Sequence, residues 1–277
     1  MTLIRADGVS RTYRSFSLVG AGAARTALAG VSLSVAAGET VALLGRSGCG
    51  KSTLARLLCG LERPDRGTVS YRGTPLARLD RAGARRFRRE VQMVFQDAPG
   101  AVNPRFDIRT IIAEPLRHLT SLDASARARR VDELLEMVEL PASLASMLPS
   151  QVSGGQLQRV CIARALAPSP ALVVLDEAVS NLDLHLQAAT LALLKRLQQA
   201  SGLAYLFVTH DLRLVERFAA RTVVMDAGTV VEETPSGALV ELRHPASLLL
   251  KSAILPPLPA RMPVRMAARM PAPAPVA

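Results

Sequence analysis

The chain has 277 residues, of which 49% are hydrophobic and 21% are charged, and its formal net charge is +11. This length allows one large α/β domain with a substantial core and room for an inserted subdomain. We find no apolar stretch near the ~18 to 20 residues that a membrane-spanning helix requires, and no basic segment followed by an apolar core at the N-terminus, so we expect neither a membrane span nor secretion.

Cysteine, histidine and aromatic content limit the possible ligands and partners. The three cysteines show no C-x-x-C spacing and the four histidines show no H-x-x-x-H pairing, which argues against disulfides, structural zinc and a dedicated transition-metal site. Aromatic residues make up 3% and tryptophan is absent, so we expect no stacking platform for single-stranded nucleic acid and no nucleic-acid partner. The positive charge alone fits an anionic membrane surface, an acidic protein or nucleic acid, and it also fits an arginine-rich composition without functional meaning.

The first part of the chain predicts short strands separated by turns. These strands are expected over residues 2–5, 31–35, 40–44, 67–71 and 91–95. Residues 17–30 are rich in Gly and Ala, which indicates a loop. An arginine cluster over residues 78–89 is interpreted as the solvated face of a helix, with a lipid or partner contact as the alternative.

Residues 45–52 form a phosphate-binding motif. They read Gly-Arg-Ser-Gly-Cys-Gly-Lys-Ser and lie between the strand over 40–44 and a helical segment over 53–58. In such a loop the backbone N–H groups converge on the β- and γ-phosphates, and the following helix adds a partial positive charge. Lys51 is expected to neutralise phosphate charge, and the Ser52 hydroxyl to ligate Mg²⁺. The expected nucleotide contacts of this segment are Gly45, Arg46, Ser47, Gly48, Cys49, Gly50, Lys51, Ser52 and Thr53.

From residue 98 to about 166 the pattern becomes helical, which predicts an inserted all-helical subdomain. One apolar stripe at i, i+3, i+4 and i+7 is formed by Val131, Leu134, Leu135 and Val138. The last helical run opens with the tetrapeptide Ser153, Gly154, Gly155 and Gln156. On its own this tetrapeptide fits a helix N-cap in a tight turn.

Buried parallel strands return after the helical segment. They are expected over residues 172–175 and 204–208, separated by a helix over 186–199. A hairpin over 223–226 and 229–232 follows. Repeated Pro, Ala, Met and Arg without periodicity then predict a disordered basic tail over 256–277.

Two acidic residues follow the first of these strands directly. Asp176 and Glu177 stand at its carboxyl end, where open α/β sheets bind their ligands. Asp176 is expected to hold Mg²⁺, and Glu177 to polarise the attacking water. Taken alone, such a pair also fits a capping or surface position, and the phosphate-binding motif upstream favours the catalytic interpretation.

The order of phosphate-binding motif, Ser-Gly-Gly-Gln and Asp-Glu resembles the ATP-binding-cassette ATPase family, and the resemblance covers residues 1 to about 235. It implies an α/β fold in which a P-loop NTPase core with a mostly parallel sheet carries an N-terminal antiparallel β-subdomain and the inserted helical subdomain. We expect the ATPase domain to span residues 1–255, with the helical insert at about 98–166. ATP and Mg²⁺ are the implied ligands.

The same resemblance assigns roles to further residues. It implies that Tyr13 stacks on adenine, that Gln96 contacts Mg²⁺ and the water, and that His210 contacts the γ-phosphate. Asp183 lies in the loop 180–183 that crosses the interface to a second subunit. Residues 153–156 close on ATP held by that second subunit, so one chain makes half of each site. The implied catalytic group is therefore Glu177, His210 and Gln96.

Four positions depart from the family pattern. Val152 stands where the signature normally begins with Leu, Ala178 and Val179 stand where many members have Pro-Thr, and Asn181 replaces a common Ala. None of these changes removes a catalytic group, so we expect an intact half-site.

Residues 103–105, Asn-Pro-Arg, resemble the peptide and nickel importer subgroup of the family. The subgroup implies a peripheral subunit on the cytoplasmic face of the inner membrane, paired with a second ATPase subunit in a heterodimer. Two transmembrane permease subunits and a periplasmic binding protein complete the implied complex. Nickel is the implied cargo, and a dipeptide or oligopeptide is the alternative.

Two other classes of protein fit less well. A soluble cassette ATPase that acts on nucleic acid or ribosomes carries a long coiled-coil insertion or two cassettes, and the segment between Lys51 and Ser153 is too short for such an insertion. A stand-alone P-loop kinase would leave residues 153–156 unexplained.

Overall fold

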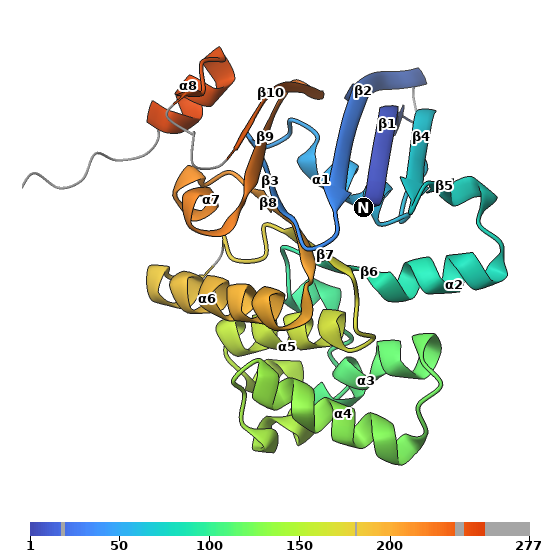
Figure 1. Cartoon of the computed structure of the whole chain (residues 1–277), viewed down its shortest axis with the longest axis vertical. Coiled ribbons are helices and arrows are strands. Elements are labelled where there is room, and N and C mark those ends of the chain that lie inside the picture. The colour runs from blue at the N-terminus through green and yellow to red at the C-terminus, as the bar shows by residue number, and fades with distance from the viewer. Residues whose placement is uncertain (18–19, 181, 236–240, 253–277) are drawn as a thin grey trace, which may run out of the picture.

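Two sheets and a helical region make up the computed structural model, which describes residues 1–17, 20–180, 182–235 and 241–252 (Figure 1). The antiparallel sheet lies at the upper right of the figure, and the helices α3 and α4 lie at the bottom. The helices are α1 (Lys51–Leu58), α2 (Arg81–Glu90), α3 (Ile108–Leu119), α4 (Ala124–Met137), α5 (Gly154–Leu166), α6 (Leu184–Ser201), α7 (Leu212–Phe218) and α8 (Pro245–Ser252).

The larger sheet has six strands in the order β10-β9-β3-β8-β7-β6. They are β3 (Thr40–Gly45), β6 (Val91–Val94), β7 (Leu172–Asp176), β8 (Ala204–Thr209), β9 (Arg221–Asp226) and β10 (Thr229–Pro235). The pairs are parallel except for the antiparallel hairpin of β9 and β10. Strands β3, β7 and β8 are buried along their whole length, as expected for a sheet covered on both faces. The predicted parallel sheet and the hairpin are confirmed.

Alternate residues of β8 enter two different hydrophobic cores. Tyr205 and Phe207 belong to a cluster shared with the helical region, whereas Leu206 and Val208 belong to a cluster shared with α1 and the antiparallel sheet. Successive side chains of a strand point to opposite faces, so this strand joins the two halves of the molecule. The site described below lies where the strands of this sheet end.

The antiparallel sheet has the order β2-β1-β4-β5, with β1 (Thr2–Ser17), β2 (Gly20–Ala36), β4 (Arg66–Tyr71) and β5 (Thr74–Pro75). The prediction of a loop over 17–30 is wrong, because β2 begins at Gly20 and pairs with β1 through positions such as Tyr13 opposite Arg25. Gly and Ala have weak intrinsic strand preference, and the pairing with β1 supplies what local sequence does not. The short strands predicted over 2–5 and 31–35 are parts of these long strands.

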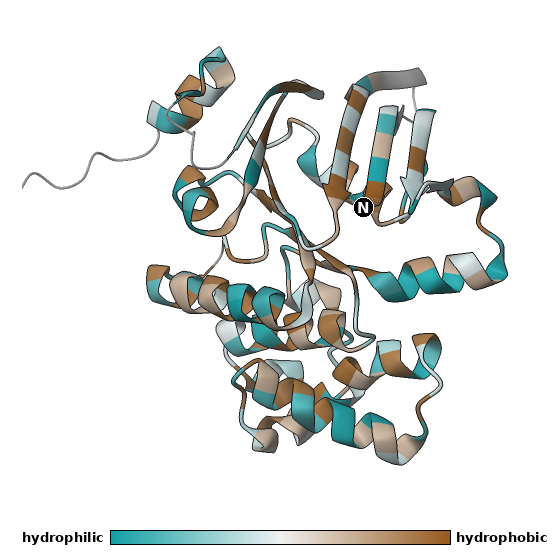
Figure 2. Cartoon of the chain, in the orientation of Figure 1, coloured by the Kyte–Doolittle hydropathy of each residue, from teal (hydrophilic) through white to brown (hydrophobic). Residues whose placement is uncertain are grey.

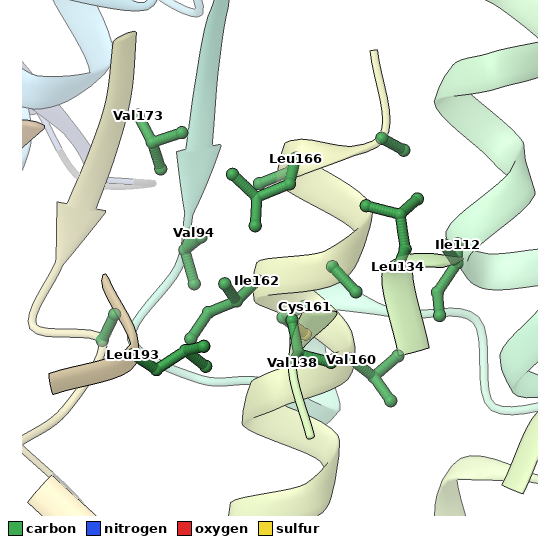
Figure 3. Close-up of a cluster of buried hydrophobic side chains, with 14 of the residues drawn as sticks. Val94, Ile112, Leu134, Val138, Val160, Cys161, Ile162, Leu166, Val173 and Leu193 are labelled. Carbon is green, nitrogen blue, oxygen red and sulfur yellow. The ribbon is translucent and has the colours of Figure 1, made fainter. Parts of the chain in front are cut away.

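The predicted helical segment contains α3, α4 and α5, and its helical character is confirmed. All four residues of the predicted apolar stripe are fully buried. Figure 3 shows Leu134 of α4 and Ile112 of α3 near Val160 of α5, with Ile162 on the side of α5 that faces Val94 of β6. The helical region therefore packs on the edge of the parallel sheet through α5.

Helix α2 carries most of the arginine cluster, and it is largely hydrophilic (Figure 2). Only Phe87 of this helix is buried, which agrees with a solvated face. Among the described helices, none combines the length and the apolarity needed to cross a bilayer. The predicted tail over 256–277 and the departure at Asn181 lie outside the described residues.

Candidate functional site

The phosphate-binding motif forms the turn between β3 and α1. Gly45 has φ 156°, and a Cβ there would lie 2.4 Å from the Met225 carbonyl oxygen. Gly50, the N-cap of α1, has φ 108°, and a Cβ there would lie 2.4 Å from the Ala27 carbonyl oxygen. Only glycine fits these two positions, because both the backbone angle and the space exclude a side chain.

Lys51 lies beneath this turn with 4% of its surface exposed. Its Nζ donates hydrogen bonds to the carbonyl oxygens of Gly45 at 2.7 Å and Arg46 at 3.0 Å. No carboxylate of the described chain lies within ion-pair distance of this ammonium. A buried cation without an anionic partner is a strong attractor for a phosphate group.

Ser52 and Asp176 meet although 124 positions separate them. The Ser52 hydroxyl donates a 3.0 Å hydrogen bond to Asp176 Oδ1, and Asp176 ends strand β7. Burial raises the pKa of Asp176, the Ser52 hydrogen bond opposes the rise, and the charge of Glu177 adds to it. A hydroxyl and a carboxylate are hard oxygen donors, and Mg²⁺ is commonly held by one or two carboxylates together with phosphates. The residues present therefore fit this ion.

Gln96, Glu177 and His210 follow β6, β7 and β8, three neighbouring parallel strands. Nε2 of Gln96 donates to Oε2 of Glu177 at 3.0 Å, and Nδ1 of His210 lies 3.6 Å from Oε1 of Glu177. Glu177 has φ 48°, a left-handed conformation that non-glycine residues rarely adopt and that clusters at active sites. The structure thus brings together all three side chains predicted to be catalytic.

Tyr13 of β1 lines the same hollow of about 290 Å³ as Lys51, Ser52, Gln96 and Glu177. The predicted nucleotide contacts Ser47, Gly48, Gly50 and Thr53 line it as well. The carbonyl oxygen of Arg46 accepts a hydrogen bond from Lys51, and the Cys49 side chain is buried within the turn.

Two arginines that line this hollow belong to no sequence motif and were not predicted as site residues. Arg25 of β2 donates to the carbonyl oxygen of Gly48 at 3.2 Å, and Arg56 of α1 also lines the hollow. Arg25 falls in the segment interpreted as a loop, and its position becomes visible only through the pairing of β1 with β2. The signal that could have revealed Arg56 is its place one helical turn after Ser52.

Residues 153–156 lie at the N-terminus of α5 and are not among the residues that line this hollow. The Ser153 hydroxyl accepts from the N–H of Gln156 at 3.2 Å, and Gln156 Oε1 accepts from the N–H of Ser153 at 2.8 Å. This capping box confirms the N-cap interpretation. Ser153 and Gly154 are exposed, and a Cβ on Gly154 would meet nothing within 4 Å.

Asp183 is exposed at the N-cap of α6, where its carboxylate accepts from the N–H of Leu186 at 2.9 Å. A Cβ on Gly155 would lie 3.0 Å from Leu186 Cδ1. The two helix starts of α5 and α6 are therefore neighbours on the surface. Within this chain, neither Asp183 nor residues 153–156 join the hollow around Lys51.

Comparison with known proteins gives a family and close relatives for this chain. The family model described as "ABC transporter" matches residues 28–180. The chain is 65% identical to the nickel import ATP-binding protein NikE of Brucella suis, covering 94% of this chain and 98% of that protein. The protein of the same name from Rhodospirillum rubrum is 60% identical, covering 93% of this chain and 93% of that protein. The one from Escherichia coli is 54% identical, covering 94% of this chain and 97% of that protein.

A solved structure supports the same assignment. The dimeric, post-hydrolysis structure of the ATP-binding cassette MJ0796 bound to ADP and Pi superposes with a TM-score of 0.75 at 30% identity, covering 84% of this chain and 99% of that one. The fold is that of an ABC ATPase cassette. From the matched family, the close relatives and the shared fold, we conclude that the chain belongs to the ABC transporter family as a nucleotide-binding ATPase cassette.

Proposed function

We propose that this chain is the ATP-hydrolysing subunit of a membrane importer for nickel. The observation that carries the proposal is the identity of 54% to 65%, over nearly the whole chain, to proteins named for nickel import and ATP binding. The geometry supports activity, since Lys51, Gln96 and Glu177 line one hollow, with Asp176 bonded to Ser52 and His210 beside Glu177. The nickel ion is cargo, and the ligands of this chain are ATP and Mg²⁺.

Nucleotide binding begins with the turn 45–53. Its backbone N–H groups and the start of α1 surround the β- and γ-phosphates, and the Lys51 ammonium neutralises their charge. Ser52, Asp176 and Gln96 would hold Mg²⁺, which supplies further neutralisation of phosphate charge when it is bound. Tyr13, on the same hollow, presents its ring to the adenine.

Hydrolysis depends on positioning more than on covalent chemistry. Glu177 accepts a hydrogen bond from the attacking water and takes up its proton as the water oxygen bonds to the γ-phosphorus. The bond from that phosphorus to the oxygen bridging the β- and γ-phosphates breaks, and ADP leaves with the electron pair. Gln96 holds one oxygen of Glu177 and leaves Oε1 directed toward the side of His210. His210, with 56% of its side chain exposed, can donate a hydrogen bond to the γ-phosphate oxygen as charge develops there.

A second subunit completes each site. In the described chain the N–H groups of Gly154 and Gly155 have no hydrogen-bond partner, and they stand at the positive end of the α5 dipole. These groups suit a γ-phosphate bound to the partner, and Asp183 beside them crosses the same interface. ATP held between two subunits then draws them together, and hydrolysis releases them.

The remaining subunits follow from the proposed role. Two transmembrane permeases form the path through the membrane, and a periplasmic binding protein delivers the cargo. This chain would sit at the cytoplasmic face of the inner membrane as a peripheral subunit, paired with a second, different ATPase subunit. Gln96 and the helical region would transmit closure of the pair to the permeases.

The test is ATP turnover by the reconstituted transporter. A binding protein loaded with Ni²⁺ should stimulate phosphate release, and one loaded with a dipeptide should not. The variant Glu177→Gln serves as the inactive control. Stimulation by the dipeptide alone would replace nickel with peptide as the cargo and leave the ATPase assignment intact.

A further inference from the structure

Tyr13 is held by ion-paired side chains that lie outside the phosphate-binding motif. Its hydroxyl donates a 2.6 Å hydrogen bond to Glu62 Oε2 and lies 3.5 Å from Thr53 Oγ1. Arg56 Nε donates to the other oxygen, Glu62 Oε1, at 2.8 Å, and Arg11 Nε lies 3.3 Å from Glu62 Oε2. A single carboxylate therefore joins Tyr13 to two cations.

The Glu62 carboxylate is suited to stay ionised in this position. Its side chain is 21% exposed. Burial opposes ionisation, but hydrogen bonds from Tyr13 and Arg56 and the charges of Arg56 and Arg11 outweigh it and keep the pKa of Glu62 below its ordinary value. The bond from the Tyr13 hydroxyl is therefore charge-assisted, which makes it shorter and stronger than a neutral one.

Arg11 covers one face of the Tyr13 ring. Its Cζ lies 5.2 Å from the ring centroid, within cation–π range. Asp65 fixes Arg11 in turn, since its Oδ1 accepts from Arg11 Nη1 at 2.9 Å. In the described part of the chain, Tyr13 lines the hollow that contains Lys51 and also a second hollow, which Arg11 lines. The covered face is thus the one away from the phosphate-binding turn, and the other face is left for a ligand.

We propose that Glu62 is a positioning residue which, together with Arg11 and Arg56, fixes the ring of Tyr13 as a preformed surface for the purine base of the nucleotide. The inference rests on the proposed function, because it assigns the base to the nucleotide site described above. A ring that is already ordered loses little rotational freedom on binding, and a free ring must be ordered by the ligand. Glu62 therefore contributes to contacts with the base, whereas Lys51 contributes to contacts with the phosphates.

Binding of two ligands to the full-length chain separates these contributions. ATP and inorganic tripolyphosphate, each with Mg²⁺, share the phosphates, and only ATP carries the base. Glu62→Ala should raise the Kd for ATP about threefold to tenfold and leave the Kd for tripolyphosphate unchanged. Tyr13→Ala should raise the Kd for ATP about tenfold. The double variant should add little to Tyr13→Ala, because both changes act through one ring.

Glu90 offers a matched control. It accepts a hydrogen bond from the Tyr71 hydroxyl and a 2.7 Å hydrogen bond from Arg72 Nη2, so Glu90→Ala removes contacts of the same kind away from this hollow. We expect it to leave the ratio of the two dissociation constants unchanged, whatever it does to the melting temperature. Glu62→Gln keeps an oxygen acceptor for Tyr13 and should retain most of the affinity for ATP, and it extends the test if Glu62→Ala fails to fold.

The proposal is overturned if Glu62→Ala weakens both ligands equally, if Glu90→Ala changes the ratio as much, or if Tyr13→Ala weakens ATP binding while both Glu62 variants leave it unchanged. The proposed function fails in a different way. It fails if Lys51→Ala leaves the binding of ATP and of tripolyphosphate intact, because the phosphates would then bind elsewhere.

Discussion

Gln96 and Glu177 stand 81 positions apart in the chain, and the Gln96 side-chain amide donates a 3.0 Å hydrogen bond to the Glu177 carboxylate. The two residues follow the ends of the neighbouring parallel strands β6 and β7. Strand β6 leads into the helical region, and β7 leads into the acidic pair. This contact links the proposed base for hydrolysis to the segment through which closure would reach the permeases.

Glu177→Gln should reduce ATP turnover of the assembled transporter by at least about 100-fold, because general-base assistance is typically worth 10² to 10⁴. ATP affinity should be preserved, since the phosphate contacts that we propose lie on the turn 45–53. Phosphate release and nucleotide binding measure the two quantities. Glu136→Gln, an exposed glutamate of α4, is the matched control, and undiminished turnover by Glu177→Gln would contradict the role of Glu177.

Lys51→Ala should weaken ATP binding strongly, by about tenfold to 100-fold, since it removes the buried cation that we propose neutralises the phosphates. Lys51→Arg should also fail, because a forked guanidinium cannot take the place of an ammonium bound to the carbonyl oxygens of Gly45 and Arg46. Calorimetric titration with ATP measures both effects. Lys195→Ala, on the exposed side of α6, should bind ATP as the unchanged chain does.

Gly50→Ala should destabilise the chain by at least about 2 kcal/mol, because alanine at φ 108° is strained and its Cβ would approach the Ala27 oxygen to 2.4 Å. Gly154→Ala should leave stability nearly unchanged, since its Cβ meets nothing within 4 Å. Thermal unfolding of the isolated chain distinguishes the two.

Gly154→Ala should nevertheless lower turnover in the assembled transporter. Its methyl group would stand at the exposed start of α5, where we place the phosphate of the partner-bound nucleotide. Normal turnover by this variant would argue that the start of α5 lies away from nucleotide.

Asp176→Asn should stabilise the nucleotide-free chain at neutral pH. Burial raises the pKa of Asp176 above its ordinary value of 3.8, so the folded state binds the proton more tightly than the unfolded state does. Ionisation of this carboxyl therefore lowers the free energy of unfolding as the pH rises above 3.8. The loss is complete once the pH exceeds the raised pKa of the folded state. Asparagine keeps an oxygen for Ser52 without the charge.

The melting temperature of the Asp176→Asn variant should be about 2–4 °C higher at pH 8. For a domain of this size, such a shift corresponds to about 1 kcal/mol in the free energy of unfolding. The gain should shrink as the pH approaches 4, and Mg²⁺-dependent ATP turnover should be lost. A gain that grows as the pH falls would show that the carboxylate stabilises the folded state instead.

Sequence predicted the parts of this molecule that local patterns specify. The strands β3, β7 and β8 are continuous apolar runs, and the motif 45–52 and Asp176 stand at their ends, so the contact of Ser52 with Asp176 follows from the parallel sheet. The helical spacing of the apolar stripe on α4 likewise predicted a helix with one buried face, and the residues of that stripe are buried.

Sequence could not predict what depends on pairing between distant segments. The long hairpin of β1 and β2 brings Arg25 opposite Tyr13, and the Gly- and Ala-rich composition of this part gave no sign of it. Glu62 lies in the turn after α1 without any motif, and its role is visible only from its contacts with Tyr13 and Arg56. Local sequence predicts residues 153–156 as a helix start. Their proposed contact with nucleotide does not follow from local sequence, because that nucleotide is bound by another subunit.

One structure decides whether nucleotide is shared between subunits: that of the assembled transporter carrying Glu177→Gln, trapped with ATP and Mg²⁺. We expect ATP at Lys51 of this chain, with the second subunit's counterpart of α5 against its γ-phosphate, and Ser153 of this chain at the second subunit's nucleotide. ATP enclosed by this chain alone, with Ser153 facing away from any nucleotide, would contradict the shared site.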